Sequence, residues 1–393
     1  MLEISQSGGI ELRRKAMLRP AHITAMTLGL ALSFAPGALV SGSRALGQEP
    51  EPVVEPPAQF QPRIMEGYPD WYIERLAARE RKILDDLGPR RNALGVRSGL
   101  IILNSEEWKP GSVVTVAFNG GTPRLHALIE RIASVWSQYG NIKFDFGRDA
   151  SGHYRTWSPT DIDYKANVRV GFQAAGFWSA IGQDSINPDI NQPVNETLNL
   201  GGYDQSLPYE FAGIIRHEFG HALGLEHEHQ SPTVACDFRW DDDPGYVRTT
   251  DKYGQFVKDS QGRRPGIYTM MAGPPNNWPK AKVDFNLRQL TTLHPDVPVA
   301  DYSMGQFDKL SIMKYYYDDS MFVSGKNSPC YSPTTNYELS AEDKKRIAMY
   351  YPSGGAVATR LEQKKATIES VLTQVPQSSL LAKELQARKG RLQ

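Results

Sequence analysis

Four of the eight histidines in this chain lie between residues 217 and 229, in the string HEFGHALGLEHEHQSP. Apolar residues at helical spacing lead into this string, and no proline interrupts residues 209–223, so we expect one helix there. On that helix His217 and His221, four residues apart, share one face with their imidazoles converging. This pair constrains the fold more than any other feature, because the surrounding structure must leave that face free for a shared ligand.

The spacing of the two histidines suits a tetrahedral zinc ion, whose nitrogen ligands lie at about 2.0–2.1 Å. Glu218 is rotated by about 100° along the helix, where it reaches a metal-bound water rather than the metal. Gly224 can take the left-handed conformation that ends the helix and reverses the chain, which brings His227 within reach of the same ion. Three histidines with one open position are typical of a catalytic zinc site, with one Zn²⁺ per chain. The alternative is a set of unrelated histidines on a helix.

Composition excludes other kinds of metal site and of partner. The two cysteines, Cys236 and Cys330, are too few and too far apart for a thiolate zinc site or a disulfide scaffold. Basic and acidic residues number 44 each, so the basic excess of a nucleic-acid-binding protein is absent. We therefore expect a metal held by His, Asp or Glu, and no nucleic-acid partner.

The N-terminal 47 residues have the three parts of a secretory signal peptide. Basic residues at positions 13–19 precede an apolar run over about 23–40, and the small-residue string Ala45-Leu46-Gly47 follows. A single membrane anchor is the alternative, but Pro36 and two glycines interrupt the span that a bilayer requires. We expect a secreted or periplasmic mature protein without a membrane span, translated from Met1 or from Met17.

The rest of the chain divides into three further parts. Residues 48–106 form a linker rich in proline and then a helix that Asp70 can cap and that Gly88-Pro89 stops. Residues 107–352 form the main domain, and 353–393 form a charged tail, which we expect to be a solvated helix or disordered. Within the main domain the patterns predict strands at 113–118, 142–146, 168–172, 177–181 and 197–200, with a helix from Thr122-Pro123 to Gly140.

The string HEFGHALGLEH resembles the zinc signature of the metzincin metallopeptidases, in which a methionine turn follows beneath the metal. Met313, in Ser311-Ile312-Met313-Lys314-Tyr315, lies downstream in the expected order. The resemblance implies an α+β fold with a mixed, mostly parallel sheet, an active-site helix that binds zinc, and a Met-turn.

Two positions favour an astacin-like over a matrixin-like member. Glu228 directly follows the third histidine, and Tyr315 lies two residues after the turn methionine, as in astacins. FDKLSIMKYYYDDSMF and LSAEDKKRIAMYYP also look like the astacin turn and closing helix, so the resemblance covers about residues 107–352. Lys314 and Gln230-Ser231-Pro232 depart from the astacin pattern, which leaves substrate specificity open.

The resemblance implies a secreted zinc endopeptidase that acts on protein or peptide substrates. His217, His221 and His227 would bind zinc, and Glu218 would move the proton of the attacking water. Tyr315 would be a further zinc ligand at rest and would stabilise the oxyanion during the reaction. The substrate would add as a strand to the sheet edge at Phe177-Trp178-Ser179. A matrixin-like peptidase and a non-catalytic zinc-binding module are the alternatives, and the sequence leaves the natural substrate and oligomeric state open.

Two further expectations concern activation and the cysteines. The acidic stretch with Glu66-Gly67 and Asp70 resembles the pro-regions of astacins, in which a carboxylate can occupy the zinc, so residues 48–106 would hold the enzyme inactive. For Asp70 the helix-cap role is the competing interpretation. In an exported protein, Cys236 and Cys330 are expected to pair, and two unpaired buried thiols are the alternative.

Overall fold

The computed structural model describes residues 65–90, 106–293 and 306–393. The expected signal peptide, and the linker as far as residue 64, lie outside the described residues. The chain divides into the units 1–48 and 49–393, and the fold described here is that of the second unit. Within the described ranges, no helix combines the length and the apolar character needed to cross a bilayer.

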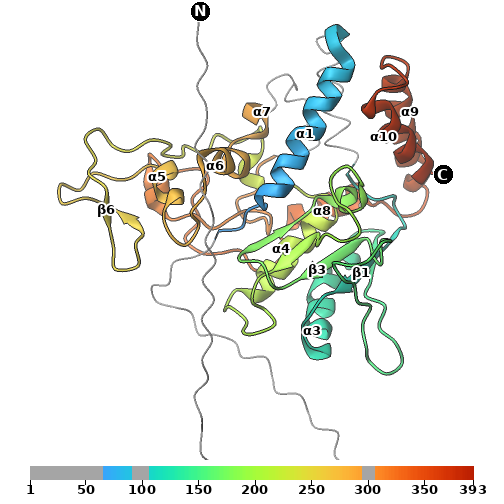
Figure 1. The fold of residues 1–393 in the computed structure, drawn as a ribbon, viewed down its shortest axis with the longest axis horizontal. Helices are drawn as coiled ribbons and strands as arrows, with labels where there is room; N and C mark the ends of the chain where they lie inside the picture. The colour runs from blue at the N-terminus through green and yellow to red at the C-terminus, as the bar shows by residue number, and fades with distance from the viewer. Residues whose placement is uncertain (1–64, 91–105, 294–305) are drawn as a thin grey trace, which may run out of the picture. The chain divides into compact units, whose positions relative to one another are not determined.

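A five-stranded sheet forms the centre of the main domain (Figure 1). Its strands are β1 (Val113–Phe118), β2 (Lys143–Asp145), β3 (Val168–Gly171), β4 (Phe177–Ser179) and β5 (Leu198–Leu200). They lie in the order β2-β1-β3-β5-β4, and every pairing is parallel except that of β4 with β5. The sequence therefore predicted the mixed, mostly parallel sheet correctly, including the edge position of β4.

Three helices pack with this sheet in one core. They are α3 (Pro123–Ala133), continued by a 3₁₀ turn at Ser134–Gln138, α4 (Phe211–Ala222) and α8 (Ala341–Tyr350). Thr122 caps α3, since its hydroxyl accepts a hydrogen bond from the backbone N–H of Leu125, and Pro123 takes the first helical position. Ser340 and Asp343 form a capping box at the start of α8. These local signals explain where both helices begin, and the first of them was predicted from Thr122-Pro123 in the sequence.

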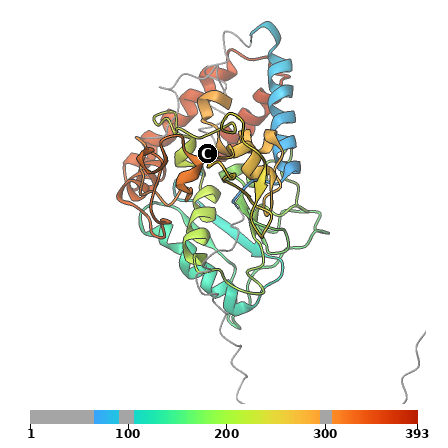
Figure 2. The ribbon, with the colours of Figure 1, turned by 90° about the vertical axis from the view of Figure 1, so that its left-hand side faces the viewer.

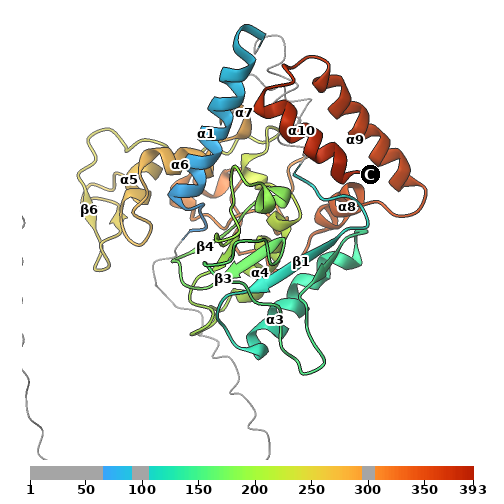
Figure 3. The same ribbon diagram turned by 45° about the vertical axis from the view of Figure 1, so that its right-hand side comes forward.

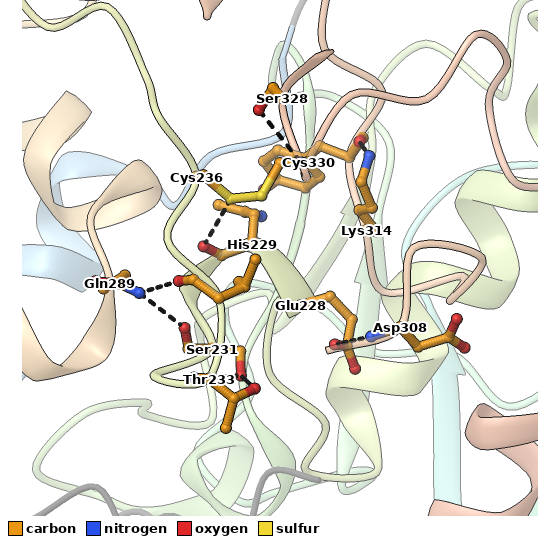
Figure 4. The surroundings of a disulfide bond; sticks show 12 residues. Glu228, His229, Ser231, Thr233, Cys236, Gln289, Asp308, Lys314, Ser328 and Cys330 are labelled. Carbon is orange, nitrogen blue, oxygen red and sulfur yellow. Dashed lines mark hydrogen bonds between the residues drawn. A yellow bond between two sulfur atoms is a disulfide. The ribbon is translucent and has the colours of Figure 1, made fainter. Parts of the chain in front are cut away.

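A second core lies in the part of the chain that follows α4. It contains residues of α5 (Ile267–Ala272) and α6 (Lys280–Leu287). The short helix α7 (Leu290–Leu293) follows α6 in the chain, and a small antiparallel pair, β6 (Thr249–Thr250) with β7 (Phe256–Val257), lies beside this core. Short 3₁₀ turns occur at Gly88–Arg90, Gly182–Ile186, Glu228–Gln230, Asp319–Met321 and Gly325–Asn327. A disulfide joins Cys236 and Cys330, whose Cα atoms lie 5.4 Å apart, so the expected pairing is confirmed (Figure 4).

The long helix α1 (Asp70–Leu87) runs beside α6 at its N-terminal end (Figure 2). It begins at Asp70 and ends before Gly88, which has the left-handed φ of 51°. The prediction that Asp70 caps this helix is wrong. Pro69 holds the cap position without a side-chain hydrogen bond, and the Asp70 carboxylate instead lies 3.0 Å from Nζ of Lys282 on α6.

The C-terminal segment differs from the expected solvated or disordered tail. It folds into α9 (Ala356–Leu372) and α10 (Leu380–Arg391), which lie side by side and next to the C-terminal half of α1 (Figure 3). Their apolar residues are too scattered to suggest a core in the sequence. In the structure these residues share a buried cluster with Ile83 and Leu87 of α1. The partner that buries them therefore comes from the opposite end of the chain.

Candidate metal centre

Helix α4 is held firmly beneath the candidate site. Its last carbonyl groups are buried, and side chains satisfy them: the Trp108 indole donates to Ala222 O over 2.8 Å, and the Tyr351 hydroxyl donates to Leu223 O over 2.6 Å. Gly224 then takes a φ of +89°, the left-handed conformation expected from the sequence, and the chain turns back toward the helix. This turn brings His227 to the same side as the two histidines of α4.

The three histidines converge on one point. Nε2 of His221 lies 3.1 Å from Nε2 of His217 and 3.0 Å from Nε2 of His227. Two nitrogen ligands of a tetrahedral zinc ion would lie about 3.3 Å apart, which follows from metal–nitrogen distances of about 2.0–2.1 Å. The structure therefore brings together all three residues that the sequence predicts as ligands.

The other nitrogen of each ring fixes its tautomer. Nδ1 of His217 donates to Ile312 O over 2.6 Å, and Nδ1 of His221 donates to Leu225 O over 2.7 Å. Nδ1 of His227 donates to Oε1 of Gln230 over 3.0 Å. Each neutral ring consequently directs the lone pair of Nε2 at the other two. The three Nε2 atoms therefore point buried lone pairs at one another, with their ring protons on Nδ1. Such a set of nitrogen donors is suited to bind a metal ion.

Glu66 completes a group of four. Its Oε2 lies 2.8 Å from Nε2 of His217, and its Oε1 lies 3.1 and 3.0 Å from Nε2 of His221 and His227. These four residues are the group of His and carboxylate side chains in the described part of the chain that could hold a metal ion. Although burial opposes it, the Glu66 carboxylate raises the pKa of His217. The negative charge of Glu66 thus favours a positive charge among the three histidines, carried either by a proton or by a metal ion. Glu66, rather than Asp70, is the acidic residue that reaches it.

Glu218 lies beside the ligands but makes no hydrogen bond through Oε2. This atom is buried, and no partner for it exists among the described residues. Burial raises the pKa of the Glu218 carboxyl well above its usual range, and the negative charge of Glu66 acts in the same direction. A buried, unsatisfied carboxyl oxygen next to a candidate metal is placed to exchange a proton with a bound water or a substrate.

Met313 and Tyr315 belong to one loop that packs against α4 and against His227. Met313 is fully buried under α4, so close that a Cβ added at Gly220 would lie 2.5 Å from its Sδ. The carboxylate of Asp343 holds this loop, because it accepts from the Ser311 hydroxyl and the Ile312 backbone N–H. The ring of Tyr315 lies 4.4 Å from that of His227, and its hydroxyl donates to the backbone carbonyl of Glu66 over 3.2 Å.

Glu228 has a structural role in this form of the protein. Its carboxylate forms a buried ion pair with Arg346 of α8 and accepts a hydrogen bond from the backbone N–H of Asp308 over 3.0 Å. Its own backbone N–H donates to Met313 O over 3.0 Å. Glu228 thus ties the segment after the third histidine to the loop that carries Met313. Nothing in the sequence pointed to Arg346 as its partner.

Residues 65–68 occupy the edge of the sheet where a substrate strand was expected. The backbone N–H of Gly67 donates to Phe177 O on β4 over 3.2 Å. On either side, the backbone N–H groups of Met65 and Tyr68 donate to the side-chain oxygens of Asn276 and Asn286 over 2.8 and 3.2 Å. Sequence reasoning missed both asparagines, because neither belongs to a recognisable motif.

The other two residues of the expected substrate edge are buried. The Trp178 ring lies 5.7 Å from that of Trp71 and 5.6 Å from that of Tyr72, both on α1. Ser179 is fully buried and donates to Ala180 O over 3.1 Å. In this structure α1 therefore covers Trp178. Residues 65–68 pair with the sheet edge through one backbone hydrogen bond, which the carbonyl of Phe177 accepts.

Side chains from several elements hold the segment after His227, and one of them, Gln230, was named in the sequence only as a departure from the astacin pattern. Besides holding His227, Gln230 donates through Nε2 to Phe285 O and Arg288 O over 3.0 Å each. Cys236 Sγ lies 3.6 Å from His229 O, and Gln289 donates to Ser231 O over 3.2 Å (Figure 4). The disulfide thus lies directly behind the segment that carries the third ligand.

No protein-family model matches the sequence, and no curated protein matches it. The solved structures that are similar to it include one described as "Structure of myroilysin" and another described as "Crystal structure of myroilysin". The first is 30% identical over 64% of this chain and 98% of its own, with a TM-score of 0.47. The second is 29% identical over 63% of this chain and 87% of its own, with a TM-score of 0.38. In both cases the protein to which this chain is similar is myroilysin.

Proposed function

We propose that this chain is a secreted zinc-dependent endopeptidase of the metzincin type, with an astacin-like site. One observation carries the proposal: Nε2 of His221 lies 3.1 and 3.0 Å from the Nε2 atoms of His217 and His227, beside a buried carboxyl oxygen that has no partner among the described residues. A structural site would need no such group, whereas a hydrolytic site requires one. The disulfide is typical of an oxidising compartment and supports export.

His217, His221 and His227 would hold the ion through Nε2, and their Nδ1 hydrogen bonds keep the three rings in that orientation. Zinc bound there would supply a Lewis acid that polarises the scissile carbonyl and makes water acidic enough to react near neutral pH. The carbonyl groups of Ile312 and Leu225 lock two of the rings, so these ligands need not reorganise when the ion binds.

Glu218 takes a proton from the attacking water and delivers it to the leaving amine. Burial and the negative charge of Glu66 raise the pKa of this carboxyl, which favours the protonated form that must deliver the proton to the amine. Tyr315 would direct its hydroxyl at the oxyanion once the Glu66 carbonyl has left. The substrate would take the place of residues 65–68 and pair with Phe177 O.

The same geometry describes a latent enzyme. Glu66 occupies the fourth position around the histidines, and residues 65–68 occupy the substrate edge. A carboxylate is a competent zinc ligand, and one held at this position would displace the reacting water. We therefore propose that residues 48–106 act as a pro-region, with Glu66 as the blocking residue.

Because the full chain is expected to be latent, the test uses Glu66→Gln, which lacks the blocking carboxylate, and compares it with the double variant Glu66→Gln/Glu218→Gln after both are loaded with zinc. Both should bind one zinc per chain, because His217, His221 and His227 are kept. Peptide hydrolysis by the double variant should fall by about 10²- to 10⁴-fold relative to Glu66→Gln, and chelation should abolish the activity of Glu66→Gln. Equal rates of hydrolysis by the two variants would refute the mechanism. If Glu66→Gln and a chain that starts near Ser98 both bind zinc but never cleave, the non-catalytic zinc-binding module is favoured.

A further inference from the structure

Helix α1 is held at two separate places. Near its N-terminus, Tyr68 and Tyr72 are buried in a cluster with Trp178 and Ile181 of the main domain. At its C-terminal end, Ile83 and Leu87 are buried in a different cluster, whose other members all come from α9, α10 and the residues beside them. These are Ile368, Val371, Val375, Leu380, Leu381, Ala382, Leu385 and Leu392. The C-terminal helices thus form a surface of their own for α1 (Figure 3).

Between these two clusters, the buried side chain of Arg79 contacts both α10 and the main domain. Nε of Arg79 lies 2.9 Å from Oε1 of Glu384 on α10, and its Nη2 contacts the other oxygen of that carboxylate. Asp184 and Glu106 of the main domain lie 3.8 and 3.9 Å from the same guanidinium. Only 5% of the Arg79 side chain is exposed. Two-pronged pairing of a buried guanidinium is both strong and specific in geometry, so Glu384 fixes α1 in rotation and along its axis.

A second polar contact fixes the end of α1 to the start of α10. The Asp86 carboxylate accepts a hydrogen bond from the backbone N–H of Leu380 over 2.6 Å. Leu380 is the first residue of α10, where backbone N–H groups have no partner within the helix. A side chain of α1 therefore completes the cap of α10, which makes the two helices mutually dependent.

The two C-terminal helices are in turn anchored to the main domain. Arg388 of α10 lies 2.6 Å from Glu106, and Arg360 of α9 lies 2.8 Å from Glu107. Between α1 and the main domain, by contrast, a cavity of about 240 Å³ remains, lined by Leu76 and Ile83 of α1 and by Phe285 and Leu290 opposite. Part of the space between α1 and the main domain is therefore unfilled, and α9 and α10 supply the apolar contact that buries Ile83 and Leu87 at the C-terminal end of α1.

We propose that α9 and α10 form a receptor for α1, and that through α1 they determine how firmly Glu66 occupies the metal centre. The occupant of this surface is the chain's own residues 70–87. The inference rests on the proposed function, since it takes Glu66 in the metal centre to be the inhibitory state. It implies that a cut between α1 and the main domain would not by itself free the site, because α1 would stay bound to α9 and α10.

The test uses the full, zinc-loaded chain and three variants. Glu384→Gln removes the carboxylate that pairs with Arg79, and Leu385→Ala removes apolar contact from the shared cluster without touching the ion pair. Glu362→Gln makes the same chemical change as the first variant at an exposed position on α9 and is the matched control. Amide hydrogen exchange of residues 70–87 reports on α1, and the rate at which a chelator extracts zinc reports on Glu66.

In Glu384→Gln and Leu385→Ala, amide exchange in α1 should be at least about tenfold faster than in Glu362→Gln, and zinc should be extracted faster. Exchange in α4 should stay unchanged, which shows that the main domain is intact. Unchanged exchange in α1 in both variants would overturn the receptor. Faster exchange with an unchanged rate of zinc extraction would overturn the link to Glu66. If both readouts respond but no variant hydrolyses peptides, the receptor stands and the proposed peptidase function falls.

Discussion

Oε2 of Glu66 lies 2.8 Å from Nε2 of His217, although the two residues are 151 positions apart in the chain. The carboxylate reaches the centre because Gly67 pairs with Phe177 at the sheet edge and Tyr315 holds the carbonyl of Glu66 itself. An intramolecular anion thus contacts all three histidines, at the position where the proposed function places the substrate carbonyl.

Glu66→Gln should raise peptidase activity of the full chain, because a neutral amide is a far weaker zinc ligand than a carboxylate. If Glu66 fills the centre in nine molecules of ten, the active fraction rises about tenfold when it leaves. Asp70→Asn is the matched control, since Asp70 pairs with Lys282 away from the metal centre. Specific activity at equal zinc content is the measurement. Equal activities of the two variants would refute the blocking role of Glu66.

A chain that starts near Ser98 lacks Glu66 and α1 altogether and should be more active than one that starts at Gln48. The comparison is made at equal zinc content with the same peptide. If the two chains hydrolyse it equally fast, residues 48–97 are only a linker and a docking helix, and the latency proposal fails even if the peptidase proposal stands.

Tyr315→Phe should reduce kcat more than KM, because the ring still packs on His227 while the hydroxyl that would reach the oxyanion is lost. The loss corresponds to about 2.7–4 kcal/mol of transition-state stabilisation. Zinc affinity should change little, since three histidines remain. Tyr317→Phe is a suitable control, because the Tyr317 hydroxyl is buried and has no partner among the described residues. An unchanged kcat in Tyr315→Phe would favour the matrixin-like alternative.

The site was predictable from the sequence to the extent that it is local. His217, His221 and Gly224 act through the geometry of one helix and the turn that ends it, and both follow from residue spacing. The choice between Glu66 and Asp70 was not predictable, because it depends on where Gly67 meets the sheet edge. In the sequence, nothing distinguishes Asp70, which starts a helix, from Glu66, which enters the metal centre.

The C-terminal helices show more clearly that contacts between distant parts of the chain cannot be predicted from local sequence patterns. Leu381 and Leu385 lie on one face of α10, but the lysines and arginines around them are typical of a solvated helix. Their partners Ile83 and Leu87 lie almost 300 positions earlier in the chain. No pattern within either segment points to the other, so burial of the tail could be seen only in three dimensions.

Replacing Cys236 and Cys330 by alanine should destabilise the protein. The disulfide closes a loop with a sequence separation of 94, and in the chain-entropy model such a cross-link contributes at most about 4–5 kcal/mol to the free energy of unfolding. Denaturant unfolding of the double variant measures this loss. Intact-mass analysis after alkylation without reductant checks the bond itself, because two added alkyl groups would show that both thiols are free.

Stability should depend on pH through Glu196. Burial raises the pKa of its carboxyl to about 7 in the folded protein, against 4.5 as the ordinary value, and its Oε2 lies over the backbone of β3 at Gly171. A raised pKa means that the protonated form favours folding. Its contribution is therefore complete below pH 4.5 and is lost as the pH rises through about 7.

Glu196→Gln cannot ionise, so its advantage in the free energy of unfolding over the wild type should grow between pH 4.5 and 7 and then level off. The shift sets an upper value of about 3 kcal/mol for this gain at pH 8. The same substitution at the exposed Glu362 should leave the pH profile of the wild type unchanged. Urea unfolding at pH 5 and pH 8 measures both variants. A Glu196→Gln protein whose stability relative to the wild type is the same at both pH values would show that the carboxyl is not held in its protonated form by the fold.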